Sequence, residues 1–275
     1  MVRRLRSLTG AHKVGHAGTL DPLATGVLPI LFESATRLAD FAHLLPKTYL
    51  AEIRFGARTN TDDAEGALEP VADPSSLDRD AVASGLAGFV GRIEQRPPAF
   101  SAVKIDGQRS YKLARAGEDV APEAREVVIE SARLLDFEPG GRAVAQVEVV
   151  CGSGTYLRAL ARDLGERLAV GGYLGRLVRS AYGPLSLAGA VSLSELTDAA
   201  AVEERLLAPE SILPEMERVR LSLDQEALVR QGRAVRVFPE PGEGPLRAHA
   251  EDGRLVALGH ADPLRRTFVP EKVLV

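Results

Sequence analysis

The most informative part of this sequence reads Gly15-His16-Ala17-Gly18-Thr19-Leu20-Asp21-Pro22-Leu23-Ala24-Thr25-Gly26-Val27-Leu28. Three glycines, one proline and two threonines among these fourteen residues predict a shaped loop rather than an ordinary helix or strand. Asp21 lies inside the loop, and a carboxylate held between glycines and a proline is suited to a reaction centre. An ordinary turn before Pro22 is the alternative, because Asp-Pro pairs are common in turns.

Length and composition define the class of protein. A chain of 275 residues with 45% hydrophobic content can form one sizeable core and a small second domain. No segment approaches the roughly 18 consecutive apolar residues of a membrane span, and no apolar signal-peptide region follows Met1, so we expect a cytoplasmic protein. Cys151 is the only cysteine, which excludes a disulfide framework and a Cys-based zinc site built from this chain alone.

The distribution of charge is uneven. A formal net charge of −4 and a pI near 5.8 do not by themselves indicate nucleic-acid binding. However, basic residues gather in three segments that contain few acids: Arg3, Arg4, Arg6 and Lys13; Lys104, Arg109, Lys112 and Arg115; Arg158, Arg162, Arg167, Arg176 and Arg179. Solvated helix faces give the same pattern, so these clusters permit an RNA partner without requiring one.

Hydrophobic periodicity predicts a mixture of helices and strands. We expect an amphipathic helix over Ser34–Leu45, a half-buried strand over Tyr49–Phe55, a hairpin formed by 127–136 and 143–150, and a helix over Tyr156–Leu168. Strands and helices do not alternate in a regular β-α-β order. The expected class is therefore α+β, with a catalytic domain around a largely antiparallel mixed sheet.

A domain boundary is predicted between Pro209 and Arg220, where an Ala- and Glu-rich stretch ends. This gives a domain of residues 1–215 and a small β-rich domain of residues 216–275. The second domain should contain a short helix over Leu221–Arg230 and four short strands: 234–238, 247–250, 255–259 and 267–275.

The loop around Asp21 resembles, in nearly every position, a motif of the TruB family of tRNA pseudouridine-55 synthases. Similar strings follow in family order: Pro46-Lys47-Thr48-Tyr49, Gly56 to Gly66, Gln95 to Lys104, and Gly154-Thr155-Tyr156-Leu157-Arg158. The resemblance covers nearly the whole chain, and its last part is similar to a PUA-type RNA-binding domain. It implies a pseudouridine-synthase catalytic domain, a PUA-like domain, and a reaction that needs no metal or other cofactor.

The resemblance also implies roles for individual residues. Asp21 matches the catalytic aspartate, Tyr49 matches the active-site tyrosine that packs on the target base and is a candidate proton acceptor, and Arg158 matches the arginine that pairs with the aspartate. Such pairing is physically reasonable, because a cation within about 4–6 Å favours the charged form of a carboxylate. Without the motif, Tyr49 would be read as a strand tyrosine and Arg158 as a helix-surface arginine.

Four further residues are expected to bind RNA. His16 matches the histidine that enters the T loop, Tyr156 matches a residue that lines the base pocket, and Lys104 and Arg176 belong to the basic segments. His16 and His12 have the spacing of helical zinc ligands, but the neighbouring glycines argue against a helix and against a metal there.

The segment Asn60–Gly66 is partly similar to a calcium-binding loop but lacks the closing glutamate, so we interpret it as a solvated loop that approaches RNA. Three departures from the family pattern stand out. Phe100 replaces a tyrosine, and Gly175-Arg176 replaces paired arginines. The family's Lys-Pro-x-Gly strand should precede Val2 and is absent, so we expect the native chain to begin upstream of Met1.

The predicted function is the isomerisation of uridine to pseudouridine at position 55 of tRNA, with Asp21 acting after the base is flipped. Covalent attack by Asp21 and assistance in ribose deprotonation both remain open. The expected partner is tRNA, bound at its T arm and acceptor end. We expect no membrane association and no obligate protein partner, and we expect the protein to be a monomer. The alternatives are an RNA-binding or tRNA-folding protein with a compromised active site, and a glycosidase that pairs Asp21 with a second acid.

Overall fold

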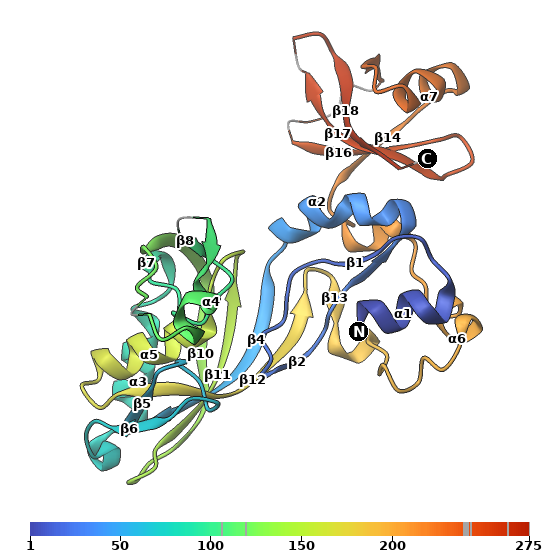
Figure 1. Ribbon diagram of the computed structural model, residues 1–275. Helices are drawn as coiled ribbons and strands as arrows, with labels where there is room; N and C mark the ends of the chain where they lie inside the picture. Colours follow the sequence, from blue (N-terminus) through green and yellow to red (C-terminus); the bar gives the residue numbers. More distant parts are fainter. Residues whose placement is uncertain (106, 119, 239–241, 243, 263, 275) are drawn as a thin grey trace. The chain divides into compact units, whose positions relative to one another are not determined.

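The computed structural model describes residues 1–105, 107–118, 120–238, 242, 244–262 and 264–274 (Figure 1). The chain divides into two compact units. The first unit comprises Met1–Thr19, Leu28–His43 and Gly183–Val275, and the second comprises Leu20–Val27 and Leu44–Tyr182. Within the described ranges, no helix has the length and apolar character needed to cross a membrane.

The second unit is built on an antiparallel sheet whose neighbouring strands follow the order β12-β4-β11-β10-β7, with β2 added in parallel to β12. These strands are β2 (Ala24–Gly26), β4 (Lys47–Phe55), β7 (Gly91–Gln95), β10 (Arg125–Glu138), β11 (Val144–Cys151) and β12 (Gly172–Tyr182). The helices of this unit are α3 (Arg79–Ala87), α4 (Ser110–Arg115) and α5 (Leu157–Arg167). The predicted strand near Tyr49, the hairpin and the helix after Tyr156 are confirmed.

Smaller elements complete the second unit. They are β5 (Ala57–Thr59), β6 (Leu68–Pro70), η2 (Pro74–Ser76), β8 (Lys104–Ile105) and β9 (Gln108–Arg109). Strands β5 and β6 form one hairpin, and β8 and β9 form another.

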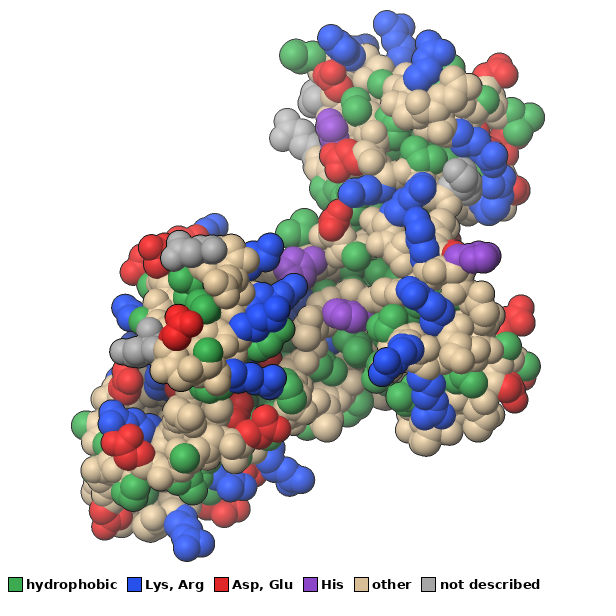
Figure 2. Space-filling model, viewed as in Figure 1, with side chains coloured by type: hydrophobic (Ala, Val, Ile, Leu, Met, Phe, Trp, Pro, Cys, Tyr) green, Lys and Arg blue, Asp and Glu red, His purple; other side chains and the backbone are tan. Residues whose placement is uncertain are grey.

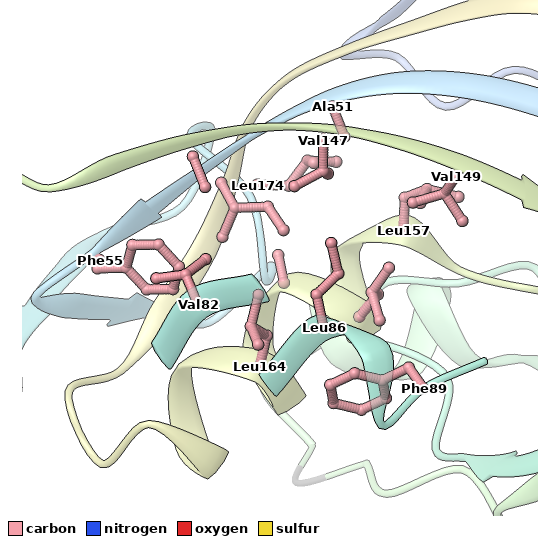
Figure 3. Close-up of a cluster of buried hydrophobic side chains, with 14 of the residues drawn as sticks. Ala51, Phe55, Val82, Leu86, Phe89, Val147, Val149, Leu157, Leu164 and Leu174 are labelled. Carbon is pink, nitrogen blue, oxygen red and sulfur yellow. The ribbon is translucent and has the colours of Figure 1, made fainter. Parts of the chain in front are cut away.

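The core of the second unit lies between the sheet and two helices. Alternate residues of β4, including Ala51 and Phe55, face Val82 and Leu86 of α3 and Leu164 of α5 (Figure 3). Because side chains alternate between the faces of a strand, this pattern makes β4 apolar on its helix side. Dense packing of α5 against β12 also needs Gly165, since a Cβ atom there would collide with the backbone of Gly172.

The stretch Gly15–Leu28 is a loop only in its middle. Its ends form β1 (Val14–His16) and β2, each three residues long, so the expectation of a loop throughout is wrong there. Pairing of β2 with β12 depends on Gly26, which has φ +104° and whose Cβ atom would collide with the backbone of Arg179. Glycine is thus required where the two backbones approach most closely.

The first unit contains a five-stranded sheet in the order β14-β16-β17-β18-β15. The strands are β14 (Glu217–Arg220), β15 (Val235–Arg236), β16 (Pro245–His249), β17 (Leu255–Asp262) and β18 (Thr267–Val273), and helix α7 spans Leu223–Arg230. Its hydrophobic core includes Phe268 and Leu246. This confirms the predicted small β-rich part of an α+β fold; Val275, where the last predicted strand ends, lies outside the described residues.

The rest of the first unit consists of short elements: α1 (Val2–Thr9), β1, β3 (Ile30–Phe32), η1 (Glu33–Leu38), α2 (Ala39–Leu44), β13 (Leu185–Ser186), η3 (Leu187–Gly189), α6 (Ala199–Glu203) and η4 (Pro209–Ile212). The predicted single helix over Ser34–Leu45 is therefore wrong in its first half, which is a 3₁₀ helix. Glu33 has φ +49°, and its carbonyl accepts a hydrogen bond from the Thr36 hydroxyl at 2.7 Å, a local bond that competes with α-helical pairing.

Candidate active site

An ion pair joins the central loop to helix α5. Asp21 lies at the start of a turn closed by a 2.9 Å hydrogen bond from Ala24 N to Asp21 O. Its Oδ2 atom accepts a 2.9 Å hydrogen bond from Nε of Arg158, in the first turn of α5. The Asp21 side chain is 30% exposed, whereas that of Arg158 is 5% exposed. The Asp21 carboxylate is thus partly accessible to solvent, while the Arg158 guanidinium that holds it is buried.

The Arg158 guanidinium is fixed by further acceptors. Its Nη1 atom donates to the Thr61 carbonyl, and its Nη2 atom donates to the Phe100 carbonyl, both at 3.1 Å. Nη1 also lies 3.6 Å from Oδ2 of Asp63. The planar fork of an arginine can meet several acceptors at once, so its position here is strongly determined.

Asp63 is a site residue that the sequence interpretation missed. The expectation of a solvated loop over Asn60–Gly66 is wrong at Asp63, which is 5% exposed. Its Oδ1 atom accepts hydrogen bonds from the Thr61 hydroxyl at 2.6 Å and from Glu65 N at 3.0 Å. Thr and Asp residues often bond to nearby backbone in this way, but the sequence does not show which carboxylate of the segment turns inward.

A second arginine, one helical turn further along α5, also binds the loop Asn60–Gly66. Arg162 donates to Asp62 and to Asp163, each at 2.8 Å, and to the Arg96 carbonyl at 2.8 Å. Burial raises the pKa of Asp62 above its usual value, and the positive charge of Arg162 opposes that shift. Two arginines four residues apart on one helix therefore hold the loop that contains Asp63.

Tyr49 lies on β4, directly opposite Arg179 of β12 in the strand register. Burial raises the pKa of the Tyr49 phenol, while Arg179 lowers it through its charge and a hydrogen bond; the negative charge of Asp21 raises it further. The phenol is thus neutral at pH 7, and its hydroxyl lies within electrostatic reach of both Asp21 and Arg179.

Next to Tyr49, the sheet contains a buried lysine. Lys47 donates from Nζ to the Ser153 hydroxyl at 2.9 Å and lies 5.0 Å from the ring centre of Tyr182. Burial lowers the pKa of Lys47 to about 8 and raises the pKa of Tyr182 to about 12. Burial likewise raises the pKa of the Cys151 thiol to about 11, which keeps it protonated at neutral pH.

Tyr156 precedes α5 and is half-buried. Its backbone is held by Gln95, whose Oε1 accepts from Tyr156 N at 2.8 Å and whose Nε2 donates to Tyr156 O at 3.2 Å. The guanidinium of Arg125 lies 5.1 Å from the Tyr156 ring centre. The Arg125 cation therefore packs on the Tyr156 ring. Aromatic rings are also the surfaces on which many proteins stack nucleic-acid bases.

The remaining predicted RNA-binding residues are exposed. Lys104 lies on β8 in the hairpin before α4, Arg176 lies on β12, and His16 lies on β1 of the first unit. Figure 2 shows Lys and Arg side chains on the visible face of both units, interspersed with acidic side chains. The roles of these three residues stay predictions.

Comparisons with known proteins agree on one family. The model of the TruB family pseudouridylate synthase (N terminal domain) matches residues 6–157. A tRNA pseudouridine synthase B from Symbiobacterium thermophilum is 48% identical over 234 residues, covering 85% of this chain and 77% of the relative. The tRNA pseudouridine synthase B of a Synechococcus species is 44% identical over 265 residues, covering 94% and 88%.

Solved structures share the fold. A chain in the crystal structure of a Cbf5-Nop10-Gar1 complex is similar with a TM-score of 0.73 and 23% sequence identity, over 100% of this chain and 80% of that chain. A chain of an H/ACA RNP bound to a substrate RNA containing 2'-deoxyuridine gives a TM-score of 0.71 at 21% identity, again over 100% and 80%. This similarity shows the fold: an α+β architecture whose β-rich last part is consistent with a PUA-like domain.

Proposed function

The chain belongs to the TruB family of pseudouridylate synthases and is an isomerase, and we propose that it converts uridine 55 in the T loop of tRNA to pseudouridine with Asp21 as the catalytic carboxylate. One observation carries this proposal: Asp21 is partly exposed and is held by the buried Arg158 at 2.9 Å. The relatives named tRNA pseudouridine synthase B support tRNA as the substrate.

The isomerisation conserves atoms and electrons. The bond from ribose C1′ to uracil N1 breaks, the base rotates, a bond from C1′ to C5 forms, and the proton leaves C5 while N1 gains one. Asp21 either adds to the nucleoside or assists proton removal from the ribose, and both routes need a carboxylate at a fixed place. Arg158 holds the Asp21 carboxylate in position and stabilises its negative charge.

Tyr49, on which the charge of Asp21 acts, and Tyr156, two residues before Arg158, provide aromatic surface. A uridine must leave its stack before an enzyme can reach it, at a cost of a few kcal/mol, and packing on aromatic side chains offsets part of that cost. We assign Tyr49 to packing against the flipped base. Its neutral phenol must lose a proton before its oxygen can accept one from C5.

RNA binding is assigned to exposed basic residues and to the β-rich part of the first unit. Lys104 and Arg176 can neutralise phosphates of the T arm, and the PUA-like sheet is proposed to hold the acceptor end. His16 is proposed to enter the T loop. We further propose a cytoplasmic monomer that contains domains of residues 1–215 and 216–275.

A direct assay tests the function. Purified protein incubated with an unmodified tRNA transcript should convert position 55 to pseudouridine in nearly stoichiometric yield, and a transcript with cytidine at position 55 should remain unmodified. Pseudouridine at another position would overturn the assignment of position 55. A mobility shift without pseudouridine would favour the RNA-binding alternative.

A further inference from the structure

Arg179 is almost fully buried although its charge is permanent. It is 1% exposed and lies on β12, paired in register with both Gly26 of β2 and Tyr49 of β4. An arginine stays charged at all ordinary pH values, and burying its guanidinium is costly unless each donor finds an acceptor. The groups that the buried Arg179 side chain contacts therefore indicate its role.

Arg179 holds the segment that follows Asp21 by two routes. Its carbonyl oxygen accepts a 2.8 Å hydrogen bond from Val27 N, and its Nε atom donates to Val27 O at 2.7 Å. Gly26 permits this approach, since any side chain at that position would collide with the Arg179 backbone. Both the main chain and the side chain of Arg179 thus fasten the end of the segment that begins at Asp21.

The same guanidinium acts on Tyr49. Strand register places Arg179 directly opposite Tyr49, and its positive charge and hydrogen bonding lower the pKa of the Tyr49 phenol against the effect of burial. The guanidinium also lies 5.1 Å from the ring centre of Tyr182, on which Lys47 packs as well. The charged and titratable groups that act on Tyr49 are Arg179, Cys151 and Asp21.

We propose that Arg179 is a positioning residue of the isomerase, which fixes the Tyr49 hydroxyl relative to the segment that carries Asp21. Arg158 holds the carboxylate from helix α5, whereas Arg179 holds the phenol from the sheet. A flipped base then meets two reaction-centre side chains in one fixed arrangement. The inference rests on the proposed roles of Asp21 and Tyr49 and adds a residue that acts through them.

A kinetic cycle tests this coupling. Arg179→Lys keeps the charge but loses the planar fork, so the single-turnover rate constant on saturating tRNA should fall by about 10- to 100-fold, with the Kd for tRNA changed less than about threefold. In a Tyr49→Phe background, which lacks the hydroxyl, the same substitution should change the rate by no more than about twofold. Arg133→Lys, at an exposed arginine of β10 paired with Glu148, is the matched control and should leave the rate unchanged.

A spectroscopic readout separates positioning from simple structural support. The chain contains no tryptophan and five tyrosines, so tyrosinate absorbance can be followed without an indole background. The difference between the titrations of the parent protein and Tyr49→Phe reports the Tyr49 phenol. Arg179→Met should move this phenol to a higher pKa, because a nearby positive charge and a donated hydrogen bond are both lost.

The outcomes are distinguishable. If the rate loss from Arg179→Lys is equally large with and without the Tyr49 hydroxyl, Arg179 has only a structural role and the inference is wrong, whatever the stability of the variants. An unchanged Tyr49 titration in Arg179→Met also overturns it; should that variant not fold, the Arg179→Lys cycle decides alone. If Tyr49→Phe itself reacts at the parental rate, the hydroxyl that Arg179 is proposed to position has no part in the reaction and the inference is wrong, whereas packing of the Tyr49 ring against the base is untouched by that result.

Discussion

The two large sheets of this protein differ in what they bury. In the second unit, the sheet and the segments packed on it bury four acidic or basic side chains: Lys47, Asp63, Arg158 and Arg179. In the first unit, the five-stranded sheet encloses mainly Val, Leu, Ala and Phe268, and among the described residues its buried ionisable side chains are Glu226 and His249.

This difference suggests that the two sheets contribute mainly to different properties, one to stability and the other to the reaction. Apolar burial stabilises a fold by about 25 cal/mol per Å², whereas buried charges cost free energy unless they are well paired. The buried acidic and basic side chains of the second unit therefore add little to the free energy of unfolding, but their contacts fix the positions of the groups around them. Substitutions there should change rates, and substitutions in the five-stranded sheet should change stability.

The largest effect is expected for Asp21→Asn. The change removes the negative charge with almost no change in shape, so turnover should fall by about 10⁴-fold or more, equivalent to about 5.5 kcal/mol, while tRNA binding stays within a small factor. Single-turnover assays and binding titrations on the same tRNA measure the two quantities. An equal loss of binding and turnover would show that Asp21 acts in RNA binding rather than in the reaction.

Phe268→Ala is expected to have the opposite signature. Phe268 is fully buried in the five-stranded sheet, and its truncation should lower the free energy of unfolding by about 3–5 kcal/mol. Chemical denaturation followed by far-UV circular dichroism measures this loss. Below the unfolding transition, the single-turnover rate on saturating tRNA should remain within about twofold of the parent, and a large fall in rate would remove the distinction between the two sheets.

Asp63→Asn tests the residue that sequence reasoning missed. Arg158 would keep Asp21 but lose its second carboxylate, and the resulting shift of the guanidinium should slow the reaction by about 100-fold. Asp62→Asn is the matched control, because Asp62 pairs with Arg162 instead of Arg158; it should slow the reaction by less than about fivefold. Similar losses in both variants would mean that the loop acts only as a scaffold.

The smallest effect concerns Lys47 and pH. The pKa of Lys47 is lowered from 10.5 to about 8 by burial, so between these values the unfolded chain binds more protons than the folded one. The stability of the parent should therefore rise with pH across this window, relative to Lys47→Met, by about 1 kcal/mol after solvent screening. Urea denaturation of both proteins at pH 7 and pH 10 provides the test, and a constant difference would contradict the buried-lysine interpretation.

Several features could be predicted because they depend on local sequence. The alternation in Tyr49–Phe55 predicts β4, and the spacing after Tyr156 predicts α5, since both patterns follow from backbone geometry alone. The pairing of Asp21 with Arg158 came from resemblance and not from spacing, because 137 residues separate them.

The sequence by itself determined that Asp21 lies on a loop framed by glycines and a proline, that the chain mixes helices and strands without regular β-α-β alternation, and that its last part is β-rich. Only the tertiary structure decided that Asp63 turns inward to Arg158 and that Arg179 is buried between Val27 and Tyr49. The physical reason is that a charged residue is exposed or buried according to partners distant in sequence. Local propensity contains no information about those partners, so the burial of a charge follows from the assembled fold.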